Sequence, residues 1–192
     1  MKETIARGMK ASAELKLSML DGGLQETVAD ISRCLIDALI SGGKVLIAGN
    51  GGSAGDAQHM AAEFVGRYLK ERDALPAIAL TTDTSALTSI GNDYGFKKIF
   101  SRQLEALGKK NDVFIAISTS GNSKNLIEAL KTAGGMGIFT VCLLGRGGGE
   151  MKDAADISLV IPSDDTPRVQ EAHIMVIHLI CEAVENAMED EK

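Results

Sequence analysis

Residues 44–55 of the chain read KVLIAGNGGSAG, an apolar run that leads directly into a glycine-rich turn. A short, continuous apolar run is typical of a strand buried on both faces, as in a parallel sheet covered by helices. Glycines after such a strand let the backbone turn tightly and approach a ligand, and the helix that follows offers free amides to an anion. This stretch therefore predicts an α/β fold with a candidate phosphate loop at Gly49–Gly55.

Four more short apolar runs follow along the chain, at residues 77–80, 113–117, 139–144 and 157–161. Helix-compatible segments lie between and after the runs, at residues 53–70, 84–106, 123–134, 148–154 and 166–189. Strands that alternate with helices indicate right-handed crossovers and a parallel sheet. The sequence therefore predicts a three-layer α/β/α sandwich around five parallel strands.

Two further helices are predicted before the first strand, at residues 4–20 and 24–41. No linker or low-complexity tract separates them from the rest. We therefore expect one domain over residues 1–192, with N-terminal helices at 1–43 and an α/β core at 44–192. The first residues lack the apolar core of a signal peptide and no run is long enough for a membrane span, so we expect a cytoplasmic protein without a membrane partner.

The charge balance narrows the class of ligand. The 192 residues carry 20 Lys and Arg against 26 Asp and Glu, a formal net charge of -6. Binding a nucleic acid through its phosphates requires clustered basic residues, which this balance opposes. One phosphate group needs only a few positioned amides and hydroxyls. We therefore expect a small anionic ligand and no nucleic acid.

A second candidate loop follows the predicted strand at 113–117 and reads STSGNS over residues 118–123. Its hydroxyls and amides can coordinate phosphate oxygens without a lysine. Ligands of parallel sheets bind beyond the carboxyl ends of the strands, where both loops are expected. Together the loops predict a sugar phosphate. Each also has a plainer interpretation, the glycine turn as a simple connection and Ser123 as a helix N-cap.

The histidines lie in two of the predicted helices. His59 and Glu63 are four residues apart and share a helix face, where they can bind a metal, act as an acid/base couple or form a surface hydrogen bond. His178 has mostly aliphatic neighbours, which is typical of a core or interface residue. A sugar isomerase needs a group that titrates near neutrality, and a histidine supplies one.

Several motifs in a fixed order give the chain a wider resemblance. The motifs are GNGGS at 49–53, DAQH at 56–59, AEFVGRY at 62–68, GNDYGF at 91–96, ISTSGNS at 117–123 and RVQEAH at 168–173, followed by His178. In this combination the chain closely resembles the bacterial phosphoheptose isomerases, which belong to the sugar isomerase (SIS) domain superfamily. The resemblance covers nearly the whole chain and implies a flavodoxin-like SIS fold with extra N-terminal helices.

The resemblance also implies an activity and a site. It implies a cytoplasmic homotetramer that converts sedoheptulose 7-phosphate to D-glycero-D-manno-heptose 7-phosphate, the first step toward the heptose of lipopolysaccharide core or a related surface glycan. The acid/base pair would be Glu63 and His178. One zinc ion per subunit would be held by His59, Glu63, Gln170 and His178. Substrate contacts carried over by motif are Asn50, Gly51, Gly52, Ser53, Asn92, Asp93, Ser118, Thr119, Ser120, Ser123 and Gln170.

One geometric point bears on the metal ligands. Gln170 and His178 are eight residues apart, about 12 Å along a straight helix. Both reach one ion only with extended side chains, with a helix that begins after Gln170, or with one ligand from a neighbouring subunit. His59 and Glu63 have no such difficulty. An active site shared between subunits is therefore a natural hypothesis.

Three other interpretations stay open. Non-enzymatic SIS proteins that associate with the bacterial replication initiator resemble the isomerases, but they lack the catalytic residues that Glu63 and His178 match. A transcription regulator with a SIS sensor would need a basic helix-turn-helix segment, which residues 1–43 do not offer. An isomerase of another sugar phosphate, such as a pentose phosphate, is the nearest enzymatic alternative, because the loops do not reveal the length of the sugar.

Overall fold

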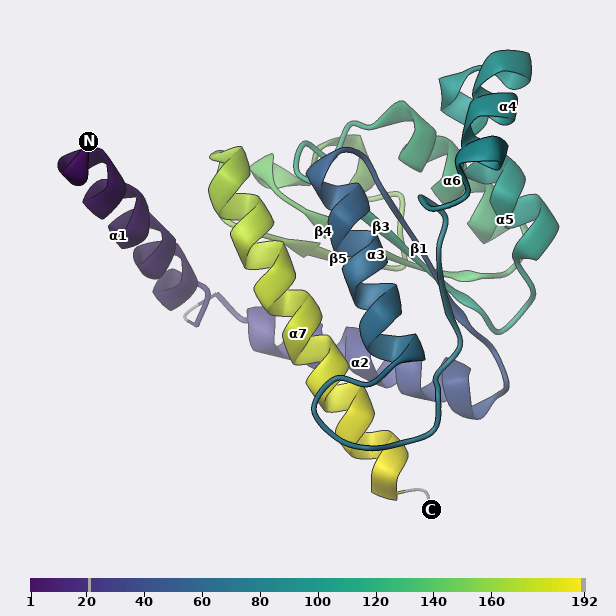
Figure 1. Ribbon diagram of the computed structural model, residues 1–192, viewed down its shortest axis with the longest axis horizontal. Coiled ribbons are helices and arrows are strands. Elements are labelled where there is room, and N and C mark those ends of the chain that lie inside the picture. The colour runs from purple at the N-terminus through teal and green to yellow at the C-terminus, as the bar shows by residue number, and fades with distance from the viewer. Residues whose placement is uncertain (21, 191–192) are drawn as a thin grey trace.

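The centre of the molecule is a sheet of five parallel strands in the order β2-β1-β3-β4-β5 (Figure 1). The computed structural model describes residues 1–20 and 22–190. Its strands are β1 (Val45–Gly49), β2 (Ala77–Ala79), β3 (Val113–Ser118), β4 (Phe139–Leu144) and β5 (Ile157–Val160). The predicted α/β fold with a five-stranded parallel sheet is confirmed.

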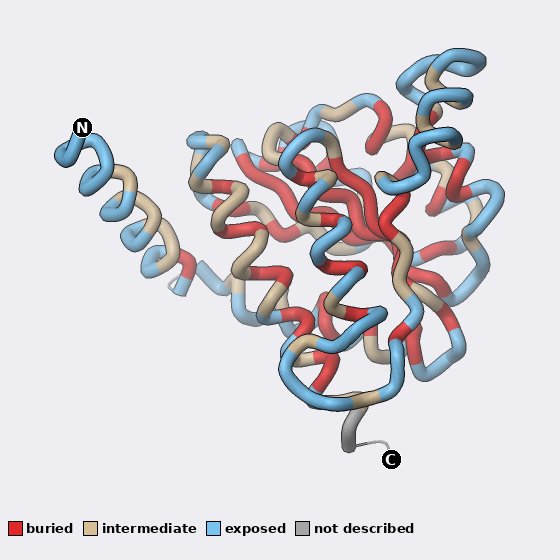
Figure 2. Tube along the Cα trace, viewed as in Figure 1, coloured by how far each residue is buried: buried red, intermediate tan, exposed pale blue. Residues whose placement is uncertain are grey.

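Helices cover both faces of the sheet. One face packs against α2 (Leu24–Ile40), α3 (Gly52–Val65) and α7 (Thr166–Asp190), and the other against α5 (Ser101–Leu107) and α6 (Lys124–Gly135). Alternate strand residues enter two separate cores, because successive side chains of a strand point to opposite faces. Ile115 shares a core with Phe64 and Ile180, whereas Phe114 shares the other with Leu130. The burial is densest along the strands (Figure 2).

Two predicted helical segments are wrong, and glycines explain both. The segment expected at 84–106 is divided into α4 (Thr84–Tyr94), the 3-10 turn η1 (Phe96–Lys98) and α5, because Gly95 has φ of +83° and ends α4. The segment expected at 148–154 is instead the 3-10 segment η2 (Arg146–Met151), in which three consecutive glycines have positive φ. This backbone conformation is open to glycine and costly for other residues.

The first helix, α1 (Lys2–Ser18), extends away from the sheet and contacts α7 (Figure 1). It has no buried residue, yet it carries exposed apolar side chains at Ile5, Met9 and Leu17. None of the helices within residues 1–20 and 22–190 has the length and apolar character of a membrane span. The predicted N-terminal helices are therefore present, and α1 leaves these apolar side chains exposed.

Candidate active site

The two predicted loops begin side by side at the carboxyl ends of β1 and β3. The strand order reverses at this point, since β1 has β2 on one side and β3 on the other. The sheet register pairs Gly49, the last residue of β1, with Ile117 of β3. In parallel sheets a ligand binds in the crevice where the order reverses. The fold therefore places both loops where a ligand is expected.

The glycine turn holds four of the predicted substrate contacts. Gly51 has φ of +57° and, with Gly52, is exposed where α3 begins. A Cβ on Gly49 would collide with the backbone of Ser53, so the turn requires glycine there. Ser53 is 3% exposed, which makes it the least accessible of the four residues. Asn50 is half-buried at the end of β1.

Two side-chain amides join the glycine turn to the hydroxyl loop. Asn50 Nδ2 donates to Asn125 Oδ1 at 3.0 Å, and Asn125 Nδ2 donates to Asn50 Oδ1 at 2.8 Å. Asn125 lies in the first turn of α6 and is 3% exposed. Asn50 was predicted at the site and Asn125 was not. The sequence held no signal for it, because a lone asparagine in a helix is ordinarily a surface residue.

The serines at the end of β3 form a hydroxyl cluster. Ser118 Oγ lies 3.1 Å from Ser123 Oγ and 3.5 Å from Ser120 Oγ, and it accepts a hydrogen bond from the Gly121 amide at 3.1 Å. Ser123 occupies the N-cap position of α6, but its side chain caps no amide. Thr119, which lies between Ser118 and Ser120 in the sequence, is half-buried. The plain N-cap interpretation of Ser123 therefore holds for its position but not for its side chain, and the phosphate interpretation of the loop stays a prediction.

The consecutive glycines of η2 pack against the hydroxyl loop. Gly121 has φ of +65°, and a Cβ there would collide with the carbonyl oxygen of Gly148. A Cβ on Gly149 would lie 2.7 Å from both polar side-chain atoms of Asn122. The two backbones therefore approach each other with no room for a side chain. The sequence located these glycines without revealing what they touch.

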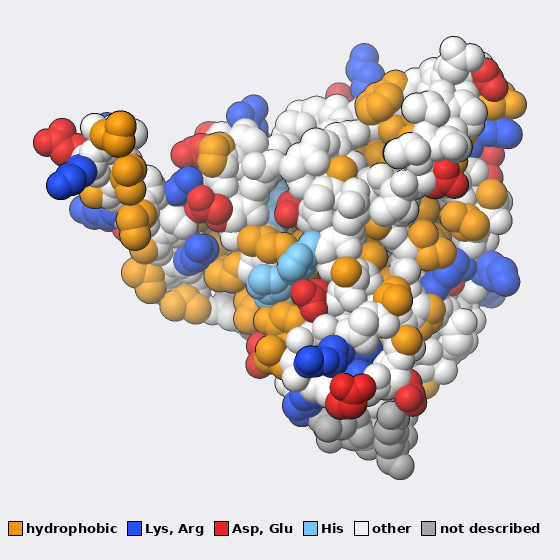
Figure 3. Space-filling model, viewed as in Figure 1, with side chains coloured by type: hydrophobic (Ala, Val, Ile, Leu, Met, Phe, Trp, Pro, Cys, Tyr) orange, Lys and Arg blue, Asp and Glu red, His pale blue; other side chains and the backbone are white. Residues whose placement is uncertain are grey.

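The side chains of His59, Glu63 and His178 meet between α3 and α7, where Figure 3 shows histidine atoms at the surface. His59 Nε2 lies 2.9 Å from His178 Nε2 and 3.3 Å from Glu63 Oε1. The Tyr68 ring lies 5.6 Å from that of His178. The structure thus brings three predicted residues together within one chain, and it removes the interpretation of His178 as a plain core residue.

The His59–Glu63–His178 cluster fits a zinc ion. The ligand atoms all lie within 4.8 Å of one another. Zinc bonds of about 2.0–2.1 Å in a tetrahedral site place neighbouring ligand atoms roughly 3.3 Å apart, close to the two separations observed. Two imidazoles with one carboxylate form a donor set that occurs in catalytic zinc sites, where a fourth position stays open. Within the described part of the chain, this is the one such group of three donors found.

Gln170, the fourth predicted ligand, lies against the glycine turn. A Cβ on Gly52 would collide with Gln170 Nε2. Gly52 and His59 are seven residues apart, about 10 Å along α3. Because α7 already begins at Thr166, a helix start after Gln170 is excluded as the way to bring Gln170 and His178 together. Extended side chains or a ligand from another subunit are the remaining ways.

Asn92 and Asp93 lie on α4, and both are exposed. Asn92 Nδ2 donates to Asp93 Oδ1 at 2.8 Å. Among the described residues, no hydrogen bond joins either of them to the glycine turn or the hydroxyl loop. Their role as substrate contacts stays a prediction.

A buried ion pair fixes the end of α3 against α7. Glu185 is 2% exposed and accepts hydrogen bonds from three successive backbone amides, Tyr68–Lys70, at 2.7–2.9 Å, and from Arg72 Nε at 3.2 Å. Arg72 also donates to the carbonyl oxygens of Glu63 and Phe64. This loop replaces the predicted continuation of α3 to residue 70. It holds the helix that carries Glu63 against the helix that carries His178.

We expect Glu185→Gln to lower the free energy of unfolding by about 3–5 kcal/mol at neutral pH, because it leaves the buried Arg72 guanidinium without a counter-charge. Burial alone would raise the pKa of Glu185, but hydrogen bonds from the three amides and the charge of Arg72 outweigh it and hold the pKa below its ordinary value. A carboxylate with a depressed folded pKa stabilises the fold above its unfolded pKa of about 4.3, and this stabilisation is lost as the pH falls through the folded pKa.

Urea unfolding of the wild type and Glu185→Gln at a series of pH values measures this effect. The difference in the free energy of unfolding between wild type and Glu185→Gln should be largest near neutral pH and should become smaller as the pH falls below about 4. Glu182→Gln, an exposed change one turn away on α7, serves as the control. Equal destabilisation by the two substitutions would show that the buried pair contributes nothing of its own.

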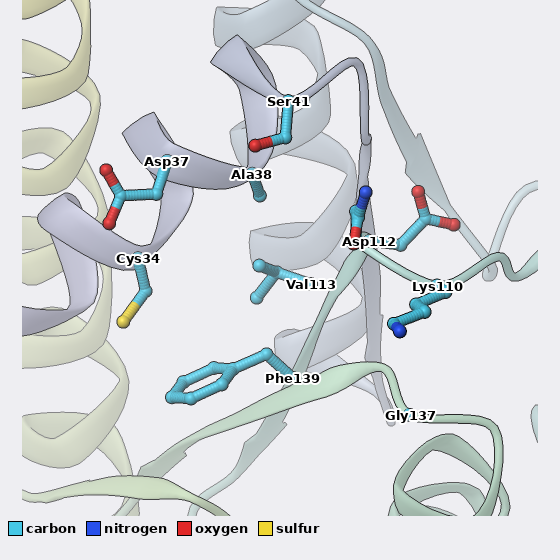
Figure 4. Close-up of a pocket in the computed structure, with 10 residues that line it drawn as sticks. Cys34, Asp37, Ala38, Ser41, Lys110, Asp112, Val113, Gly137 and Phe139 are labelled. Carbon is cyan, nitrogen blue, oxygen red and sulfur yellow. The ribbon is translucent and has the colours of Figure 1, made fainter.

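A separate cavity of about 370 Å³ lies at the opposite edge of the sheet, near the amino ends of β3 and β4 (Figure 4). Burial and the nearby Asp37 carboxylate raise the pKa of the Cys34 thiol, so the thiol is protonated at neutral pH. Asp112 is 2% exposed and already paired with Lys44 Nζ at 2.6 Å. This cavity contains none of the candidate residues.

Comparisons with known proteins agree with this geometry. Residues 10–145 match the SIS domain family. The phosphoheptose isomerase of Clostridium acetobutylicum is 54% identical over 193 aligned residues, which cover 100% of this chain and 98% of that protein. The phosphoheptose isomerase of Campylobacter concisus is 62% identical over 151 residues, which cover 79% and 80% of the two chains.

A solved structure extends the likeness to three dimensions. The phosphoheptose isomerase of Neisseria gonorrhoeae matches with a TM-score of 0.91 and 43% sequence identity, covering 96% of this chain and 98% of that chain. That of Francisella tularensis matches with a TM-score of 0.92 and 34% identity, covering 96% and 97%. Sequence and structure agree over nearly the full length, and the chain therefore belongs to the phosphoheptose isomerase family of SIS domain proteins.

Proposed function

We propose that this chain is an aldose–ketose isomerase that converts sedoheptulose 7-phosphate to D-glycero-D-manno-heptose 7-phosphate. The product would be a precursor of ADP- or GDP-heptose for lipopolysaccharide core or another surface glycan. The observation that carries the proposal is the meeting of His59, Glu63 and His178 between two helices that also border the glycine turn. The names of the similar proteins support the same activity.

Two side chains, one a carboxylate and the other an imidazole, would carry out the proton transfers. An aldose–ketose interconversion moves one proton between adjacent carbons and a second between their oxygens, through an enediol. We assign the carbon proton to the Glu63 carboxylate as general base, and the oxygen proton to the His178 imidazole. Both groups are held by helices rather than loops, which restricts their motion relative to the substrate.

The two loops would hold the substrate in place. Ser118, Ser120 and Ser123 present hydroxyls at the start of α6, where the helix dipole also favours a phosphate. The half-buried amide of Asn50, which is hydrogen-bonded to Asn125 of α6, has polar groups to offer to sugar hydroxyls. The serines would thus hold the phosphate end of the substrate, and the carbonyl end of the sugar would be left for the acid/base pair.

The residues that would hold zinc are His59, Glu63 and His178, with Gln170 as the predicted fourth. When bound, the ion would supply a Lewis acid that polarises the carbonyl or hydroxyl at the reacting carbons. Glu63 then has two duties, as ligand and as base. His59 would act as a ligand only, with its ring beside the side chains of Glu63 and His178.

We also propose a cytoplasmic homotetramer, as the resemblance implies. An apolar groove of about 680 Å³ lies between α1, α2 and α7, and Leu17, Leu20 and Leu179 in it are exposed. Figure 3 shows apolar side chains continuing along α1. A second copy would cover this surface, and a neighbouring subunit could bring Asn92 and Asp93 to a site. Light scattering of the full chain tests the assembly.

Purified protein should convert sedoheptulose 7-phosphate to the aldose, lose the activity on treatment with a chelator and regain it when zinc is restored. The activity should be lost because the chelator removes the zinc ion, which would act as the Lewis acid and would order the three side chains. A pentose phosphate run in parallel is the control for substrate length. Turnover of the pentose phosphate alone would overturn the proposed substrate, and no turnover of either would favour the partner-binding interpretation.

A further inference from the structure

The reciprocal amide pair of Asn50 and Asn125 is a direct hydrogen-bonded link between the two candidate loops. The two bonds, of 3.0 and 2.8 Å, join residues 75 positions apart in sequence. Asn50 directly follows β1 and Asn125 lies in the first turn of α6, so the link crosses the crevice where the strand order reverses. Any change in the link changes the relation between the glycine turn and the hydroxyl loop.

The Asn125 side of the link is rigid. Its side chain is 3% exposed, and its Oδ1 also accepts a hydrogen bond from the Leu126 amide at 3.0 Å. The following residues of α6, among them Leu126 and Leu130, are anchored in the core. The orientation of the Asn125 amide is therefore set by the helix rather than by a ligand.

The Asn50 side of the link retains binding capacity. A side-chain amide has two N–H groups and two lone pairs, and the pair with Asn125 uses one of each. One N–H and one lone pair of the half-buried Asn50 are therefore left for a ligand. Because an amide is planar, fixing one N–H and one lone pair also fixes the direction of the others.

We infer that Asn125 is a positioning residue that orients Asn50 toward the sugar phosphate and sets the separation of the two loops. The inference rests on the proposed function for the identity of the substrate, but the amide pair itself does not depend on it. Asn125 acts through Asn50 on substrate binding and touches none of the reacting atoms. Its loss should therefore raise KM and leave kcat nearly unchanged.

Asn125→Asp tests this inference with no change in size. The carboxylate still accepts from the Leu126 amide and from Asn50 Nδ2, but the donor to Asn50 Oδ1 is lost and a buried negative charge takes its place. We expect KM for sedoheptulose 7-phosphate to rise about tenfold near pH 8, with kcat within about twofold of wild type. Burial at this position raises the pKa of the introduced carboxyl, and its protonation restores a donor, so the ratio of variant to wild-type KM should fall as the pH is lowered.

Asn111→Asp is the matched control, since Asn111 is exposed at the opposite edge of the sheet. It should leave KM unchanged at every pH. An unchanged KM in Asn125→Asp, an equal rise in Asn111→Asp or a ratio that does not vary with pH would each overturn the inference. If Asn125→Asp fails to fold, Asn125→Ser replaces it, and a wild-type KM in that variant overturns the inference too.

The inference and the proposed function fail in distinguishable ways. A wild type that does not turn over sedoheptulose 7-phosphate contradicts the proposed function. In that case the crystal structure of Asn125→Asp still tests the positioning role, because Asn50 and the glycine turn should move relative to the hydroxyl loop. An unchanged position of Asn50 in that crystal structure would contradict the role of Asn125.

Discussion

Glu63→Gln is expected to lower kcat for the isomerisation by about a thousandfold, because glutamine fills the same space but cannot accept the carbon proton. Glu63 is half-buried beside His59, so the substitution changes its charge without opening a cavity. Initial rates of aldose formation, at substrate concentrations above and below KM, measure the effect. Glu71→Gln is the control, since Glu71 lies on the loop after α3 and its side chain is 93% exposed.

The same variant separates the two duties of Glu63. Its zinc content and its rate in excess zinc are measured together. A variant that holds zinc and remains slow identifies Glu63 as the base, whereas full recovery in excess zinc would make it a ligand only. Because Glu63 and His178 meet within one chain, a mixture of inactive Glu63→Gln and inactive His178→Gln chains should not regain activity. Recovery in the mixture would contradict this arrangement.

Gly121→Ala is expected to lower the free energy of unfolding by about 2–5 kcal/mol. A left-handed backbone costs a residue with a Cβ about 1–2 kcal/mol, and the collision with the Gly148 carbonyl adds an overpacking cost of about 1–3 kcal/mol. The hydroxyl loop would also be displaced, which raises KM. Urea unfolding measures the free energy of unfolding. The KM of the folded protein reports the displacement of the hydroxyl loop.

Gly134→Ala is the matched control for this substitution. Gly134 lies in α6, and a Cβ there would meet nothing within 4 Å. Alanine at such a position should stabilise the protein by about 0.5–1 kcal/mol, because it reduces the entropy of the unfolded chain. Equal and small effects of the two substitutions would mean that η2 gives the hydroxyl loop no support.

The architecture could be predicted from the sequence because its signals are local. Continuous apolar runs identified all five strands, and the turns after two of them marked the ligand edge. The helix boundaries were harder. Gly91 lies inside α4, whereas Gly95 has φ of +83° and ends it. The two glycines look alike in the sequence, and only the tertiary structure decides which of them breaks the helix.

The candidate site could be predicted only in part for the same reason. His59 and Glu63 could be predicted from their spacing of four residues on one helix. His178 entered through the family resemblance, because periodicity does not reveal that α7 packs against α3. Asn125 and Glu185 were missed altogether. Their partners lie far away in sequence, so each reads as an ordinary polar residue of an amphipathic helix.

Proton transfer through an enediol, with Glu63 as the base, is tested most directly by proton NMR of sedoheptulose 7-phosphate incubated with the zinc-loaded protein in deuterium oxide. The expected result is an aldose 7-phosphate that carries deuterium on the carbon next to its aldehyde, formed by wild type and by Glu71→Gln and nearly absent with Glu63→Gln. A sugar phosphate that stays unchanged with wild type, or an aldose formed at the same rate by Glu63→Gln, would contradict it.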